Sequence, residues 1–163
     1  MSNSYKNKIT TVQIETTNNC NYRCLMCART DRPPCKKQDL SLANYKKLLV
    51  QLKKLPIKNF VGHNLGEPLL TPKFAQMLEY FDANFKGKHF IFNTNGSVLP
   101  KHFVQRFLGL HNNHFHINFS IDAATKRTYQ KLHNHSFLAS KKNIIYFLQE
   151  LIKSKNKKIR VVL

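Results

Sequence analysis

Two adjoining stretches of the sequence decide the fold. Residues 10–16 read Thr-Thr-Val-Gln-Ile-Glu-Thr, and residues 20–27 read Cys-Asn-Tyr-Arg-Cys-Leu-Met-Cys. The first stretch alternates apolar and polar residues and is rich in β-branched types, which predicts a β-strand that ends just before Cys20. The cysteines then lie in the loop that leaves this strand.

The same strand-and-helix unit recurs along the chain. Further strands are predicted at residues 59–63, 89–93, 115–121 and 159–163. Helices are predicted over residues 42–55 after the N-cap Ser41, over 72–85 with Thr71 as N-cap and Pro72 in the first position, over 100–110 and over 140–153. A short helix or turn is expected over 123–132. Strands that alternate with helices pair in parallel through right-handed crossovers, so we expect an α/β fold, either an open doubly wound sheet or part of a (βα) barrel.

Unusual polar residues follow each of the first four predicted strands. After the cysteines come Gly66-Glu67-Pro68, Asn95-Gly96, and Ser120 with Asp122. In both candidate architectures ligands bind at the carboxyl ends of the strands, so these four loops are expected to converge on one rim. Phe115, which lies between His114 and His116, is read as part of an alternating strand rather than of a metal site.

Composition places the chain in the globular class. With 163 residues it is long enough for one domain, which we expect over residues 9–163 after a polar tail at 1–8. No stretch is long and apolar enough for a membrane span or a signal core, so we expect a cytoplasmic protein without membrane partners.

The charge of the chain is strongly positive. The 27 Lys and Arg against 8 Asp and Glu give a net charge of +19, but the basic residues are scattered along the sequence. A Lys-rich solvated surface is favoured over nucleic-acid binding.

All four cysteines fall between residues 20 and 35, which favours metal or redox chemistry over a disulfide framework. The spacing CxxxCxxC places three thiolates in one short loop, where they can hold one iron-sulfur cluster. Three buried structural cysteines would also fit this spacing. Zinc is the stronger alternative, if Cys35 or His63 supplies a fourth ligand. Cys35 is otherwise read as a spare thiol.

These motifs together resemble the radical S-adenosylmethionine (radical SAM) superfamily. The resemblance rests on CxxxCxxC at Cys20, Cys24 and Cys27 and on three further segments in matching order: Leu65-Gly66-Glu67-Pro68-Leu69-Leu70, Thr94-Asn95-Gly96 and Phe119-Ser120-Ile121-Asp122-Ala123. The pattern is most similar to members that carry a cysteine-rich carboxyl-terminal extension, which this sequence lacks. The resemblance implies a partial (βα) barrel, a truncated core of about four βα units plus a fifth strand.

The resemblance also implies a chemistry and assigns roles to residues. The three cysteines would hold a 4Fe-4S cluster whose open iron binds S-adenosylmethionine. Reductive cleavage would yield a 5'-deoxyadenosyl radical that abstracts hydrogen from an unknown substrate, with peptide, protein or RNA modification as examples. A flavodoxin or ferredoxin would supply the electron. The implied cofactor contacts are Gly66 and Glu67 to the methionine amino group, Ser120 and Asp122 near the ribose or carboxylate, Met26 near the adenine, and Asn95.

Three features leave alternatives open. Asn95-Gly96 also fits a simple turn, and Asp122 also fits a helix N-cap for residues 123–129. The sequence ends inside the fifth strand, so a partner chain, a second copy or further sequence is expected to cover that apolar edge. Two other functions therefore stand beside the enzyme: a non-catalytic iron-sulfur or zinc-binding remnant, and a basic nucleic-acid-binding module.

Overall fold

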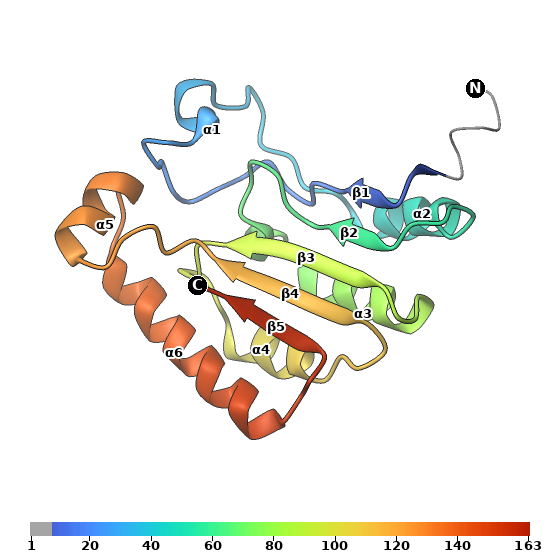
Figure 1. Ribbon diagram of the computed structural model, residues 1–163. Helices are drawn as coiled ribbons and strands as arrows, with labels where there is room; N and C mark the ends of the chain where they lie inside the picture. Colours follow the sequence, from blue (N-terminus) through green and yellow to red (C-terminus); the bar gives the residue numbers. More distant parts are fainter. Residues whose placement is uncertain (1–7) are drawn as a thin grey trace.

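The computed structural model describes residues 8–163, and most of the expected tail at 1–8 lies outside this range. Five parallel strands form one sheet in sequential order (Figure 1). Their bounds are β1 Thr11–Gln13, β2 Asn59–Val61, β3 His89–Thr94, β4 His114–Phe119 and β5 Ile159–Val162. All five predicted strands are confirmed, and β1 is the most shortened of them.

Each pair of neighbouring strands is joined by helical structure. The helices are α1 Ala28–Asp31, α2 Leu42–Leu52, the 3-10 turn η2 Pro68–Leu70, α3 Phe74–Asn84, α4 Lys101–Leu108, α5 Lys126–His133 and α6 Phe137–Ser154. The crossover helices α2, α3, α4 and α6 cover one face of the sheet (Figure 1). Sequential strand order with helices on one face is a segment of a (βα) barrel, whereas a doubly wound sheet reverses its order and is covered on both faces.

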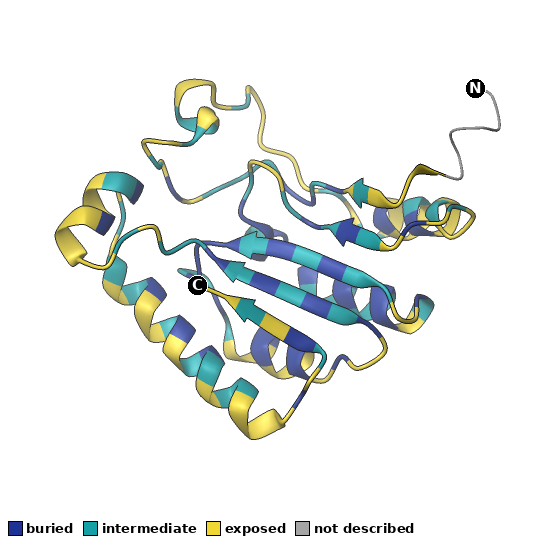
Figure 2. Cartoon of the chain, viewed as in Figure 1, coloured by how far each residue is buried: buried dark blue, intermediate teal, exposed yellow. Residues whose placement is uncertain are grey.

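The core lies between the sheet and these helices and is unusually aromatic. Strands β3 and β4 alternate strictly between partly exposed and buried residues (Figure 2). Phe81 of α3 is fully buried and packs against the rings of Phe60, Phe85, Phe90 and Phe115 at centroid separations of 4.9 to 6.2 Å. Offset and edge-on aromatic pairs of this kind add to the burial of apolar area, so this cluster holds the sheet and helices as one body.

The start of α3 corrects one prediction. Thr71 does not cap this helix, and Pro72 is not its first residue, because α3 begins at Phe74 after Lys73. Residues 68–70 form a 3-10 turn capped by Glu67, and Thr71 ends that turn. The buried Thr71 hydroxyl donates instead to Thr16 Oγ1 at 3.0 Å, which fixes the loop after β2 against the loop after β1.

The start of α5 corrects a second prediction, the one made for Asp122. Asp122 does not cap a helix, because α5 begins at Lys126 and Thr125 caps it by accepting from the Thr128 N–H at 3.2 Å. The intervening residues extend the loop after β4, which leaves the Asp122 carboxylate free for other contacts.

No helix within residues 8–163 has the length and apolar character that a membrane crossing requires.

Candidate functional site

The loops that follow β1, β2, β3 and β4 meet around one cavity of about 220 Å³ at the carboxyl ends of the strands. Every residue that the sequence singled out for the site lines this cavity: Cys20, Cys24, Met26, Cys27, Gly66, Glu67, Asn95, Ser120 and Asp122. The lining also includes His63, which was considered as a zinc ligand, Thr94 of the Thr94-Asn95-Gly96 motif, and four residues for which the sequence predicted no contact: Tyr22, Asn64, Asn93 and His133. The predicted convergence of the loops is therefore observed.

Backbone hydrogen bonds shape the cysteine loop, residues 20–27. The Cys27 N–H donates to the Cys24 carbonyl at 3.1 Å, and the Thr30 hydroxyl donates to the same carbonyl at 2.7 Å. The one-turn helix α1 begins directly after Cys27. These bonds close the loop into a compact turn that keeps Cys24 and Cys27 on the same wall of the cavity.

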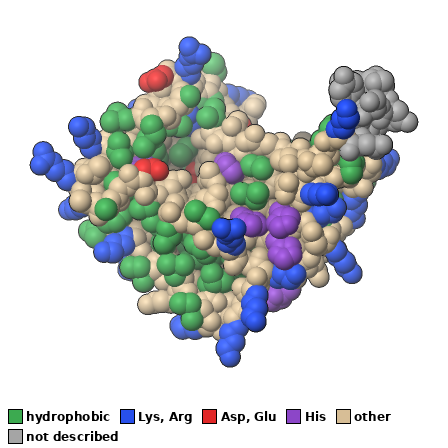
Figure 3. Space-filling model, in the orientation of Figure 1, with side chains coloured by type: hydrophobic (Ala, Val, Ile, Leu, Met, Phe, Trp, Pro, Cys, Tyr) green, Lys and Arg blue, Asp and Glu red, His purple; other side chains and the backbone are tan. Residues whose placement is uncertain are grey.

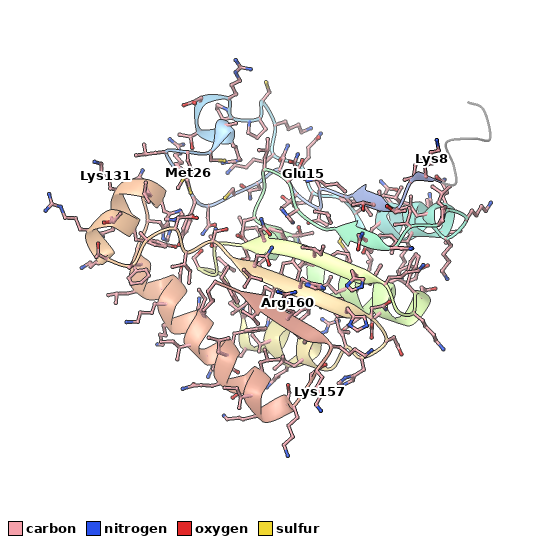
Figure 4. The ribbon with its side chains drawn as sticks, viewed as in Figure 1. Lys8, Glu15, Met26, Lys131, Lys157 and Arg160 are labelled. Carbon is pink, nitrogen blue, oxygen red and sulfur yellow. The ribbon has the colours of Figure 1, made fainter. Side chains whose placement is uncertain are left out.

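A buried polar cluster anchors this loop to the last two helices. The Tyr22 hydroxyl lies 2.8 Å from Ser140 Oγ, and the Tyr129 hydroxyl lies 3.3 Å from the first oxygen and 3.2 Å from the second. The Leu25 N–H also donates to the carbonyl of Leu132 at 2.8 Å. The cysteine loop is thus held by α5 and α6 as well as by its own turn, and Met26, labelled in Figure 4, extends from it with just over half of its surface exposed.

The three cavity cysteines are free, half-buried thiols, whereas Cys35 is exposed and does not line the cavity. Burial raises the pKa of Cys20. Burial, reinforced by the neighbouring cysteines and Asp122, raises the pKa of Cys24 to about 11. Both are therefore protonated at neutral pH, and a metal that binds them must displace these protons.

Within residues 8–163 no three His, Cys, Asp or Glu side chains converge closely enough to hold a single metal ion. One zinc ion needs all its sulfur ligands at about 2.3 Å from one point. Thiolates of a four-iron cluster bind different irons and stand further apart. Cys20, Cys24 and Cys27 line one cavity, and thiolates are the donors that such a cluster takes. His63 does reach the cavity, but Cys35, the other fourth ligand considered for zinc, does not.

Gly66 is required where the loop after β2 crosses the loop after β1. A Cβ atom at this position would lie 1.8 Å from the Thr17 carbonyl oxygen, so no larger residue fits. The carboxylate of Glu15 accepts from the Leu65 and Gly66 N–H groups at 2.8 and 3.2 Å. Gly66 therefore lies against the chain's own backbone at Thr17, and Glu15 is a site-forming residue that sequence reasoning missed.

Glu67 is buried and ties the loop after β2 to the loop after β3. Its Oε1 accepts from the Thr94 hydroxyl at 2.7 Å and the Leu69 N–H at 3.1 Å, and its Oε2 accepts from the Asn95 N–H at 2.8 Å. Burial raises the pKa of Glu67, although these three bonds oppose the shift. A carboxylate offers about four acceptor positions, and these bonds fill three of them.

Asn95 connects the loop after β3 to the cysteine loop. Its Nδ2 donates to Asn21 Oδ1 at 3.0 Å, and its Oδ1 accepts from the N–H and hydroxyl of Ser97 at 2.9 and 2.7 Å. Gly96 follows with φ at +70°, a conformation that suits glycine. Asn95-Gly96 is thus a turn, and the same turn lines the cavity.

The loop after β4 contributes Ser120 and Asp122, and it meets a residue that sequence reasoning missed. His133, the last residue of α5, is buried with its Nδ1 3.1 Å from Cys24 Sγ. Its Nε2 lies 3.1 Å from Asp122 Oδ2 but off the direction of an N–H hydrogen bond, so the two groups are close without being hydrogen-bonded. Burial lowers the pKa of His133, while Asp122 opposes the shift.

Neither the Lys and Arg side chains nor the histidines of the strands form a second cluster of site residues in the view of Figure 3. Lys and Arg side chains are spread around the visible face rather than gathered in one stripe, whereas His side chains gather over the open face of the sheet (Figure 3). His89 Nδ1 lies 3.0 Å from His116 Nε2, and its ring stacks on His114 at 5.0 Å. The reading of His114 and His116 as alternating strand residues is confirmed, because Phe115 between them is buried.

Comparison with known proteins gives the family. The sequence profile of the Radical SAM superfamily matches residues 14–163. The GTP 3',8-cyclase of Synechocystis sp. is 29% identical over 130 residues, which cover 79% of this chain and 38% of that protein. The molybdenum cofactor biosynthesis protein moc-5 of Caenorhabditis elegans is 29% identical over 131 residues, 76% of this chain and 20% of that protein. The chain thus spans well under half the length of these relatives.

Solved structures with the same fold include Streptococcus suis SuiB bound to S-adenosylmethionine and BtrN in complex with AdoMet and 2-DOIA. SuiB matches with a TM-score of 0.67 at 15% identity. The match covers 93% of this chain and 33% of the SuiB chain. BtrN matches with a TM-score of 0.61 at 19% identity. The match covers 94% of this chain and 56% of the BtrN chain. The chain belongs to the radical SAM superfamily, as its motifs and its partial barrel predicted.

Proposed function

We propose that this chain is a radical SAM enzyme that holds a 4Fe-4S cluster through Cys20, Cys24 and Cys27 and cleaves S-adenosylmethionine reductively. One observation carries the proposal. The three cysteines and all six residues expected to contact the cofactor come from four separate loops and line the same cavity. The parallel sheet brings the four loops to one rim, but its core packing does not require those loops to carry polar groups.

The cysteine loop supplies the soft donors. Its three thiols are free, and its turn is closed by bonds to the Cys24 carbonyl, so the sulfurs stay available to iron. Three protein ligands would leave one iron of a four-iron cluster open to a small molecule. When bound and reduced, such a cluster supplies the electron that splits S-adenosylmethionine into methionine and a 5'-deoxyadenosyl radical, which abstracts hydrogen from a substrate.

The other loops supply the wall against which S-adenosylmethionine would lie. The remaining acceptor position of Glu67 suits the ammonium group of the methionine moiety. Ser120 and Asp122 are the polar groups on the opposite loop for the ribose or carboxylate, and Met26 offers an apolar surface to the adenine. A flavodoxin or ferredoxin is the reductant that we propose for this site.

Anaerobic reconstitution of the full chain with iron and sulfide tests this proposal. We expect about four iron and four sulfide per chain, and an electron paramagnetic resonance (EPR) spectrum of the dithionite-reduced protein that changes when S-adenosylmethionine is added. Cys24→Ser should lose the cluster. Cys35→Ser is the matched control and should keep it, because Cys35 lies outside the cavity. Binding of one metal ion without sulfide would contradict the proposal and favour the zinc-binding alternative.

A further inference from the structure

His133 lies between the cysteine loop and the loop after β4. Its side chain is 2% exposed, and its two ring nitrogens face two different cavity residues. Nδ1 is 3.1 Å from Cys24 Sγ, and Nε2 is 3.1 Å from Asp122 Oδ2. The part of the chain that the structure describes gives neither Cys20 nor Cys27 a comparable side-chain partner, since Cys20 Sγ accepts only the Tyr22 N–H at 3.5 Å.

Packing fixes the imidazole in this position. The ring of Tyr129, one helical turn earlier on α5, lies 4.3 Å from it between centroids, and that of Tyr22 lies at 5.9 Å. The bond from the Leu25 N–H to the Leu132 carbonyl joins the backbone next to Cys24 to the backbone next to His133. The contact between His133 and Cys24 is therefore held by both side-chain packing and main-chain bonding, unlike a contact between mobile surface groups.

We propose that His133 is a positioning residue for the cluster and that its Nδ1 donates a hydrogen bond to the sulfur of Cys24. This inference rests on the proposed function. An iron-bound thiolate carries no proton and can only accept, so the imidazole must be the donor in that state. Hydrogen bonds to cluster sulfurs stabilise the more negative, reduced form and raise the reduction potential. His133 therefore makes Cys24 electronically distinct from the other two ligands and eases reduction.

Two substitutions separate this role from simple packing. His133→Leu keeps a branched side chain of similar reach but removes the donor. His133→Asn keeps an amide nitrogen the same number of bonds from Cα as Nδ1. In redox titrations of the reconstituted full chain followed by EPR, we expect the Leu variant to have a more negative cluster potential than wild type, and the Asn variant to recover most of the difference.

His135 offers the matched control. It lies two residues further along and stacks on Tyr22 at 4.2 Å, and within residues 8–163 its side chain makes no hydrogen bond to a sulfur atom. His135→Leu should therefore leave the potential unchanged. A Leu variant at position 133 that carries a full cluster at the wild-type potential would overturn the proposal and reduce His133 to a packing role.

A measurement on the unmutated protein covers the case in which the Leu variant does not fold. With ¹⁵N-labelled histidine and no S-adenosylmethionine present, pulsed EPR of the reduced cluster should detect a coupled histidine nitrogen. Absence of that coupling overturns the proposal. If the wild-type chain takes up no cluster at all, the proposed function fails and this inference fails with it, so the two failures are distinguished by the iron and sulfide content of the wild type.

Discussion

The carboxylate of Glu67 accepts a 2.8 Å hydrogen bond from the backbone N–H of Asn95, which joins the ends of β2 and β3 at the floor of the cavity. The bond is buried, and Glu67 also accepts from Thr94 and Leu69. A carboxylate placed this deep is costly unless it is hydrogen-bonded, so the three bonds that Glu67 accepts fix the shape of the site before any ligand binds.

This burial predicts a pH dependence of stability. Because the pKa of Glu67 is raised above its ordinary value of 4.5, the folded chain binds more protons at this position than the unfolded chain above that pH. Its contribution to the free energy of unfolding therefore falls as pH rises from 4.5 through the raised pKa. Glu67→Gln lacks this ionisation. In urea unfolding between pH 4.5 and 7.5, the free energy of unfolding of the variant should therefore increase relative to that of wild type as pH rises. A stability difference that stays constant with pH would contradict the assignment.

Gly66→Ala should destabilise the fold strongly. The added Cβ would meet the Thr17 carbonyl oxygen at 1.8 Å, and that oxygen belongs to the backbone and cannot rotate away. We expect a loss of about 3 kcal/mol, at the upper end of the usual cost of overpacking. Gly109→Ala is the control, since its nearest atom would be 3.4 Å away, and it should change stability by less than about 0.5 kcal/mol. Equal losses in chemical denaturation would argue against the close crossing of the two loops.

Tyr22→Phe tests the attachment of the cysteine loop to α5 and α6. The substitution keeps the ring but removes the hydroxyl that lies 2.8 Å from Ser140 Oγ, which should cost about 1 kcal/mol of unfolding free energy. Tyr80→Phe is a control at a partly exposed tyrosine outside this cluster, and its loss should stay below about 0.5 kcal/mol. If the two variants unfold alike, the hydroxyl cluster does not anchor the loop.

Strands and helices were predictable where the signal is local. The alternation around Phe90 and Phe115 and the helical spacing after Ser41 each reflect a few neighbouring residues, and the structure follows them. The beginning of α3 was missed because a tertiary bond decides it. The Thr71 hydroxyl donates a hydrogen bond to Thr16, 55 residues earlier in the chain, and does not cap the helix that follows.

In the site, too, residues in local motifs were predictable, and residues placed by tertiary contacts were not. The nine residues in the motifs were predictable because each motif lies at the end of a strand, and parallel strands bring such ends together. Glu15 and His133 were not, since they belong to no motif and their partners are distant in sequence. Cys24 and His133 are 109 residues apart, and only the packing of α5 against the cysteine loop brings them into contact.

The central claim is tested most directly by assaying the anaerobically reconstituted chain for 5'-deoxyadenosine after reduction with dithionite in the presence of S-adenosylmethionine. We predict that the wild type forms this product, that Cys35→Ser forms it at a similar rate, and that Cys24→Ala forms none. A wild-type chain that carries a full cluster but yields no 5'-deoxyadenosine would contradict the enzymatic proposal and support a non-catalytic iron-sulfur protein.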